Sequence, residues 1–188
     1  MKRAALFITV LLASAAPVFA GQAGTETTVR VGGQAMFPSK TIVANAVNSA
    51  DHTTLVTAVK AAGLVGTLNG PGPFTVFAPT NQAFAMLPAG TVENLVKPEN
   101  KTTLTRILTY HVVPGSYDTN KLRSMIVEGN GSAMLKTVSG GKLWVMMNGS
   151  SNITVKDEKG DIADITISDV RQSNGVIQVV DHVLLPGA

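Results

Sequence analysis

The stretch from residue 73 to residue 87, PFTVFAPTNQAFAML, changes its hydrophobic period at one point. Residues 74–78 alternate between two faces and include β-branched and aromatic side chains, which is typical of a β-strand. Pro79 has no N–H and ends the strand, and the Thr80 hydroxyl can then accept from the free N–H groups of a new helix. The next apolar residues recur at helical spacing: Ala83, Phe84 and Leu87. The sequence therefore predicts a strand joined directly to a capped helix.

Helical patterns flank this junction on both sides. Ser39 is predicted to cap a helix that starts at Lys40, and Asp51 a second helix that ends at Gly63. The clearest helix is predicted over residues 100–113, with a buried stripe made of Leu104, Ile107, Leu108 and His111.

The last third of the chain is predicted to consist of short strands. Gly, Asn, Ser and Asp residues separate apolar runs at 133–138, 142–147, 153–156, 162–167 and 176–180. Early helices followed by strands favour an α+β fold in which helices pack on a mostly antiparallel sheet.

Residues 1–20 have the features of a secretory signal peptide. Lys2 and Arg3 precede an apolar stretch, and Ala20 completes a site of the type that signal peptidases cleave. A membrane anchor is disfavoured, because the run is shorter than the roughly 20 apolar residues that span a bilayer. We expect cleavage after Ala20 and a secreted or periplasmic protein. Residues 21–35, rich in Gly and Thr, are expected to form a flexible leader, and residues 36–188 a single domain.

Composition and motifs exclude several classes of function. Without Lys2 and Arg3 the net charge falls from +3 to +1, and no cationic cluster with interleaved aromatics suggests nucleic acid. The chain has no cysteine, which excludes a thiol nucleophile and a cysteine-based metal site. The sequence also lacks the G-x-S-x-G, P-loop, H-E-x-x-H and dinucleotide-binding motifs. We therefore predict a protein that is not an enzyme and needs no cofactor or metal.

Three segments resemble signatures of the fasciclin-like domain family, in the family's usual order. They read PFTVFAPTNQAF, LTYHVVPG and NGVIQVVDHVLLP, and the resemblance covers roughly residues 36–186. It implies a fasciclin-like fold, with N-terminal helices packed on a β-wedge or sandwich, and a role in cell adhesion or matrix binding. Many members carry histidine where this chain has Gln178. Any polar contact of that position is expected to be made by the amide here, or to be missing.

Tyr110 and His111 are the candidate binding residues, because the resemblance links this segment to integrin-dependent adhesion in animal relatives. The helical period favours another role for His111, namely a buried structural residue whose imidazole finds a partner near Thr80 and Asn81. Tyr110 lies beside the apolar stripe, so we expect its hydroxyl to be exposed.

The remaining polar candidates are assigned structural roles. Thr80 and Asn81 lie at a helix N-terminus, where an anion could bind, but capping is the favoured role. Asp181 is expected to hold a neighbouring backbone N–H. The carboxylates around Gly160 lack the spacing of a calcium loop, so a solvated hairpin tip is favoured there: Asp157, Glu158, Asp161 and Asp164.

Two functions follow from these observations. The first is an exported, non-enzymatic binding module that contacts a cell-surface or extracellular-matrix protein or polysaccharide. Bridging two surfaces needs two engaged sites, so self-association is one way for such a domain to act in adhesion. The alternative is a periplasmic carrier of a small hydrophobic, lipid-like ligand in a cavity near Trp144 and Met146, with Met134 and Met147 close by.

Overall fold

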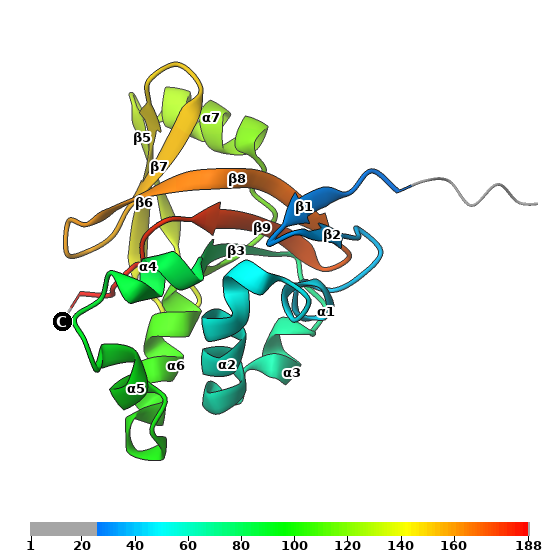
Figure 1. Ribbon diagram of the computed structural model, residues 1–188. Coiled ribbons are helices and arrows are strands. Elements are labelled where there is room, and N and C mark those ends of the chain that lie inside the picture. The colour runs from blue at the N-terminus through cyan, green and yellow to red at the C-terminus, as the bar shows by residue number, and fades with distance from the viewer. Residues whose placement is uncertain (1–25, 188) are drawn as a thin grey trace, which may run out of the picture.

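The computed structural model describes residues 26–187, and the predicted signal peptide lies outside them. The helices fall mainly in the first two thirds of this range (Figure 1): α1 (Ile42–Ala46), η1 (Ala50–His52), α2 (Thr53–Ala62), α3 (Val65–Leu68), α4 (Asn81–Ala85), α5 (Thr91–Leu95), η2 (Pro98–Asn100), α6 (Lys101–Tyr110) and α7 (Thr119–Glu128). The strands are β1 (Val29–Val31), β2 (Gln34–Met36), β3 (Phe74–Pro79), β4 (Val112–Pro114), β5 (Ser132–Lys136), β6 (Lys142–Asn148), β7 (Asn152–Lys156), β8 (Ile162–Gln172) and β9 (Gly175–Val180).

Seven strands form one sheet in the order β4-β3-β9-β8-β7-β6-β5, while β1 and β2 form a separate hairpin. Neighbouring strands are antiparallel except β3 and β9, which run parallel with Phe74 opposite Gly175 and Pro79 opposite Val180. These two strands carry the first and last of the three signature segments, which therefore lie side by side inside the sheet. The predicted α+β fold with a mostly antiparallel sheet is confirmed.

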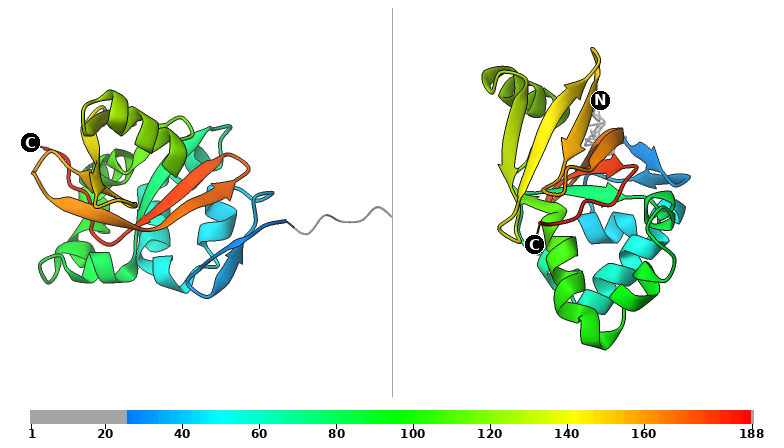
Figure 2. Two further views of the ribbon diagram at one scale, coloured as in Figure 1. Left: turned by 90° about the horizontal axis from the view of Figure 1, so that it is seen from above. Right: turned by 90° about the vertical axis from the view of Figure 1, so that its left-hand side faces the viewer.

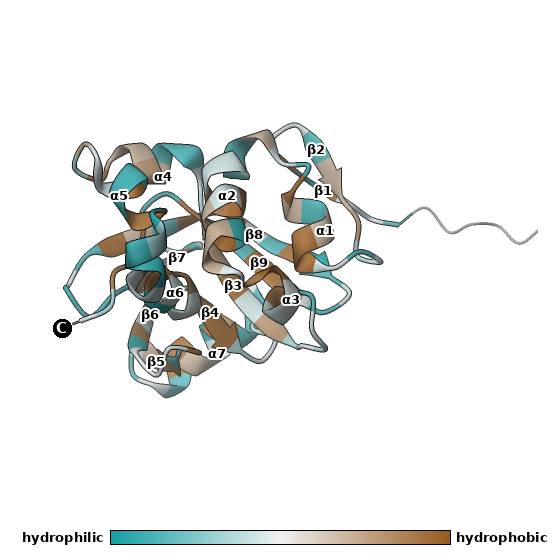
Figure 3. Cartoon of the chain, turned by 90° about the horizontal axis from the view of Figure 1, so that it is seen from below, coloured by the Kyte–Doolittle hydropathy of each residue, from teal (hydrophilic) through white to brown (hydrophobic). Residues whose placement is uncertain are grey.

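Strands β3 and β9 separate two hydrophobic cores, because successive side chains of a strand point to opposite faces. Val76 and Ala78 lie in the core between the sheet and the helices, which we call the helical core. Phe77, between them in sequence, lies in a second core, which we call the strand core. Figure 3 shows hydrophobic residues on β3 and β9 and on the helices α1, α2 and α3 beside them.

The sheet curls so that its two edges approach each other. After β5, the N–H of Val138 donates to the Val112 carbonyl on β4 at 2.8 Å, and Ser139 donates to the Thr109 carbonyl at 3.3 Å. Helix α7 lies beside β5, away from the other helices, and contributes Leu122 and Ile126 to the strand core (Figures 1 and 2). The result is a β-wedge with helices below it.

The first ordered elements differ from the sequence-based boundaries. Val31 and Met36 of the β1–β2 hairpin are buried in the helical core, so packing begins within the range expected to be a flexible leader. The predicted cap at Ser39 is wrong. Helix α1 starts at Ile42, and Thr41 Oγ1 accepts from the N–H of Ala44 at 3.3 Å.

The next two helices also differ in part from the prediction. Asp51 lies inside η1 and does not cap α2, whereas the αL residue Gly63 ends α2 as predicted. Helix α6 ends at Tyr110, earlier than expected, because Val112 and Val113 enter β4, which pairs with β3. Strand β8 continues to Gln172, past the predicted end at residue 167, through two register shifts against β9.

Helix α7 was missed, although its sequence carries the expected signals. Asp118 accepts from the N–H of Lys121 at 3.0 Å and caps the helix, Leu122 and Ile126 follow at helical spacing, and Gly129 ends it. None of the helices in residues 26–187 is long and apolar enough to cross a lipid bilayer.

Candidate functional site

His111 lies at the C-cap of α6 and is buried, with 2% of its surface exposed. Its Nδ1 is 2.9 Å from the Ile107 carbonyl, and its Nε2 is 3.0 Å from the N–H of Leu184. Because a carbonyl only accepts and an amide N–H only donates, Nδ1 carries the proton and Nε2 accepts. The partners are therefore backbone groups of α6 and the C-terminal segment, and not the Thr80–Asn81 junction that the sequence suggested.

Tyr110 is completely buried and faces the strand core, so the prediction of an exposed hydroxyl is wrong. Its hydroxyl donates to the Lys142 carbonyl at 2.7 Å and accepts from the N–H of Glu158 at 2.9 Å. Consecutive residues at the end of α6 thus hold two different parts of the chain. Neither Tyr110 nor His111 offers its side chain to a partner at the surface.

Burial shifts the titration of both residues away from neutral pH. Desolvation lowers the pKa of His111 to about 4, with partial compensation from the Ile107 carbonyl. Desolvation also raises the pKa of the Tyr110 hydroxyl, and the charges of Glu158 and Asp157 add to that rise. Both side chains are therefore neutral at physiological pH, which suits a structural role.

The Thr80–Asn81 pair connects the strand–helix junction to the start of α2. Thr80 Oγ1 accepts from the N–H of Ala83 at 3.2 Å and caps α4. Asn81 accepts at Oδ1 from the N–H of Thr54 at 3.0 Å and donates at Nδ2 to the Ala50 carbonyl at 2.8 Å. The donors and acceptors of this pair are used within the fold.

Asp181 and Asp157 are likewise bonded to backbone amides. Asp181 Oδ1 accepts from the N–H of Asp164 at 2.7 Å and from His182 Nδ1 at 2.9 Å. Asp157 is buried, and its carboxylate accepts from the N–H groups of Lys159, Asp161 and Leu185. The turn around Gly160 is therefore not a purely solvated tip. Within residues 26–187, no group of three or more metal-binding side chains is suitably placed for an ion.

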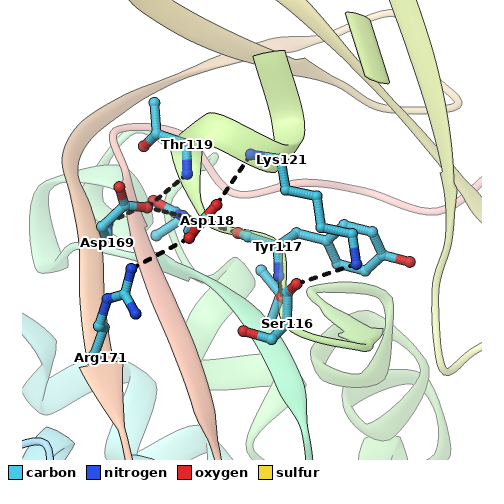
Figure 4. A network of polar contacts seen from close by, with 9 residues as sticks. Ser116, Tyr117, Asp118, Thr119, Lys121, Asp169 and Arg171 are labelled. Atoms are coloured by element: carbon cyan, nitrogen blue, oxygen red, sulfur yellow. Dashed lines mark hydrogen bonds and ion pairs between the residues drawn. The ribbon is translucent and has the colours of Figure 1, made fainter. Parts of the chain in front are cut away.

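A polar network missed by the sequence analysis lies where β4 leads into α7 (Figure 4). The Asp118 carboxylate caps α7 and pairs at 3.2 Å with Arg171 of β8. Asp169, in the left-handed region at φ 57°, accepts at Oδ1 from the N–H of Thr119 at 2.7 Å. Gln178 is fully buried. Its Oε1 accepts from the N–H of Asp169, and its Nε2 donates to Asp169 Oδ1 and to the Tyr117 carbonyl. The amide thus makes the contact that the family resemblance left open at this position.

Next to this network is an open cleft of about 480 Å³, which we call the Arg171 cleft. It is lined by residues from three separate parts of the chain: Pro71, Gly72, Pro73, Ser116, Arg171, Gln172, Ser173, Asn174, Gly175 and Val176. Asn174 fixes its floor by accepting from the N–H of Ile42 and donating to the carbonyls of Leu68 and Gly70. The Arg171 side chain is 66% exposed, so it remains available beside its ion pair with Asp118.

Two largely apolar cavities of the described residues lie away from Trp144 and Met146, where the sequence predicted one. Met134 is 53% exposed on β5, and Leu143 and Val145 fill the strand core on the other face of β6. One of the two cavities, of about 150 Å³, lies in the helical core between the helices and the sheet, and the other, of about 300 Å³, lies between α4, α5, α6 and the C-terminal segment.

Comparison with known proteins agrees with the fold and with the three signatures. The sequence profile of the fasciclin domain matches residues 50–186, and the chain belongs to the fasciclin domain family. Among the relatives, protein sll1483 of Synechocystis is 46% identical over 164 residues, which cover 86% of this chain and 82% of that protein.

In two further relatives the match covers less than half of the longer protein. Transforming growth factor-beta-induced protein ig-h3 of Sus scrofa is 38% identical over 136 residues, covering 71% of this chain but 17% of that protein. Cell surface glycolipoprotein MPB83 of Mycobacterium bovis is 36% identical over 125 residues, which cover 66% of this chain and 49% of that protein. A FAS1 domain pair from the insect cell adhesion molecule Fasciclin I has the same fold, with a TM-score of 0.70 at 18% identity, covering 79% of this chain and 52% of that one.

Proposed function

We propose that this chain is an exported, non-enzymatic binding module that acts at a cell surface or in the extracellular matrix. Membership of the fasciclin domain family supports this proposal, as do the names of two similar proteins, a cell surface glycolipoprotein and a cell adhesion molecule. Export would depend on residues 1–20, with cleavage after Ala20.

The Arg171 cleft is the observation that carries the proposal. It combines two loops with the β8–β9 turn and the strand ends beside it on a frame of buried hydrogen bonds, and binding residues are characteristically found where a rigid scaffold positions loops. By contrast, the buried side chains of Tyr110 and His111 in the signature segments make their hydrogen bonds to backbone groups inside the fold. Recognition is therefore assigned to the Arg171 cleft and not to Tyr110 or His111.

Arg171 determines the chemistry of the partner. A guanidinium has five N–H donors, and Asp118 takes only one of them, so the others can pair with a carboxylate of a bound molecule. The hydroxyls of Ser116 and Ser173 add neutral donors and acceptors along the same cleft. A cell-surface or matrix protein or polysaccharide that carries carboxylates fits these groups.

Charge reversal in the cleft tests the function. The Arg171→Glu variant is compared with wild type for binding to the envelope and matrix fractions of the source cells. Lys136→Glu, an exposed residue of β5, is the matched control because it changes the net charge equally. We expect at least a tenfold loss of binding for Arg171→Glu and less than a twofold change for Lys136→Glu. Wild-type binding by a folded Arg171→Glu variant would exclude the cleft as the binding site.

We keep a periplasmic carrier of a small hydrophobic ligand as the second candidate, and the cavity in the helical core is the observation that favours it.

A bridging role in adhesion would need a second binding site, which self-association can supply. Light scattering at micromolar concentration tests self-association. A strictly monomeric protein with a single partner would count against a bridging role.

A further inference from the structure

The cavity in the helical core has a volume of about 150 Å³. Its lining comes from the β1–β2 hairpin, from η1 and the helices α1, α2, α3 and α6, and from the strands β3, β4, β8 and β9, and it includes Val31, Ile42, Val59, Leu68, Val76 and Ile177. An engineered aliphatic cavity of about 150 Å³ in another protein stays free of water and binds benzene or xenon. A cavity of this size and lining can therefore hold one small apolar molecule, whereas a lipid chain would exceed it.

The cavity reaches the surface between α1 and α2. Five lining residues there are partly or fully exposed: Val43, Ala46, Val47, Val56 and Lys60. Val47 alone has 47% of its surface exposed at the end of α1. A small molecule has a short path from solvent past these side chains.

One polar side chain at this cavity has an unused hydrogen-bonding atom. His52 is 4% exposed, and its Nδ1 is 2.9 Å from the hydroxyl of Ser49. Its Nε2 is one of two buried side-chain nitrogens that lack a hydrogen-bond partner within residues 26–187. Burial lowers the pKa of this histidine, and the Ala78 backbone, which approaches the ring without completing a hydrogen bond of good geometry, and the Asp51 charge only partly offset that shift. The imidazole is thus neutral at physiological pH.

The second histidine at the cavity provides a contrast. His111 also lines this space, but its two nitrogens are already occupied by Ile107 and Leu184. A buried polar atom without a partner is unfavourable, so a bound molecule that reaches Nε2 of His52 gains a hydrogen bond. A water molecule is poorly suited, because it needs two to four polar partners and the lining offers few.

We propose that this cavity binds a small, largely apolar molecule about the size of a substituted benzene ring, with one hydroxyl that bonds to Nε2 of His52. A hydroxyl suits either tautomer of the ring, since it both donates and accepts. The proposal concerns the second candidate function only. It does not depend on binding at the Arg171 cleft.

The test uses phenol and benzene as probes, because they differ by a single hydroxyl. Binding to the purified protein is measured from the chemical shifts of the Ile and Val methyl groups, and both probes should shift those of Ile42 and Ile177. His52→Leu keeps the site apolar but removes its hydrogen-bonding atom. We expect the ratio of phenol to benzene affinity to fall at least fivefold in this variant, and to stay unchanged in His182→Leu, which alters an exposed histidine.

Two variants that fill the cavity complete the test. Val59→Phe places a ring in the space, and Ala46→Leu narrows it from a half-buried position in case the first variant does not fold. Either folded variant should lose at least tenfold in affinity for both probes. The proposal fails if neither probe shifts the cavity methyl groups in the wild-type protein. It also fails if His52→Leu retains the full preference for phenol.

Discussion

The imidazole of His111 accepts a hydrogen bond at Nε2 from the backbone N–H of Leu184, 3.0 Å away and 73 residues later in the chain. At the same time its Nδ1 donates to the Ile107 carbonyl one turn earlier in α6. The ring therefore joins the end of α6 to the C-terminal segment and is held in a single neutral tautomer.

His111→Phe should destabilise the protein by about 2–4 kcal/mol, because it leaves the Leu184 N–H and the Ile107 carbonyl buried without partners. Urea denaturation measures the change in the free energy of unfolding. A variant with unchanged stability but lost partner binding would instead place His111 in recognition.

The stability of the wild-type protein should fall as the pH is lowered. Burial lowers the pKa of His111 to about 4 from its ordinary value of 6.5, so between these values the unfolded state binds a proton that the native state does not. This contribution is fully present above pH 6.5 and is lost as the pH falls towards 4. Between pH 7 and 4.5, His111→Gln should lose about 2–3 kcal/mol less stability than wild type. Equal losses would contradict the assigned pKa.

Tyr110→Phe should cost about 1–3 kcal/mol, since it removes the hydroxyl that pairs with the Lys142 carbonyl and the Glu158 N–H. Tyr117→Phe is the matched control, because within residues 26–187 the Tyr117 side chain contacts Lys121 through its ring and not through a hydroxyl hydrogen bond. The control should change stability by less than about 0.5 kcal/mol. Thermal and urea unfolding of both variants compare the two sites, and similar losses would weaken the structural role of Tyr110.

Gly175→Ala should be strongly destabilising, by about 2 kcal/mol or more. A methyl group at this position would clash with the Phe74 carbonyl, which lies opposite in the parallel pair of β3 and β9. Gly149→Ala is a useful comparison, because a methyl group there meets no atom within 4 Å and only its left-handed backbone, at φ 71°, opposes the change. A smaller loss at Gly175 than at Gly149 would show that the close approach is easily relieved.

The predicted export can be checked by intact mass. Protein recovered from the periplasm or the medium should begin at Gly21, and Ala20→Lys should accumulate as uncleaved precursor. Full-length protein in the cytosol of its source cells would contradict the assignment.

Native mass spectrometry of protein purified from its source cells without detergent tests the carrier function, which predicts a bound small molecule.

Much of the architecture could be predicted because its signals are local. The change of period at Pro79 places a strand next to a capped helix, and Gly63 marks the end of α2. The prediction of an exposed Tyr110 hydroxyl was wrong for a physical reason, because a single apolar stripe on α6 suggests that only one side of the helix is buried. The molecule has two cores, so the residue next to the stripe enters the strand core.

The Arg171 cleft could not be predicted in the same way. Pro71, Ser116 and Ser173 come together only through the pairing of β3 with β4 and β9, which involves residues about 40 and about 100 positions apart. Asp118 and its helix carried a local signal that was overlooked, since a cap, two apolar residues at helical spacing and a glycine stop were all present. The unpaired nitrogen of His52 depends on packing and has no sequence signal.

The parallel pair of β3 and β9 has a consequence for how the chain reaches its native state. Strand β3 needs β9 on one side, and β9 follows it by about 100 residues, so the middle of the sheet stays incomplete until the chain through β9 has been made. A growing chain that lacks Val176 and its neighbours exposes the edges of both β3 and β8, where aggregation or chaperone binding can begin. The sheet is therefore completed only after β9 has been synthesised, and until then the chain N-terminal to it cannot reach its native packing.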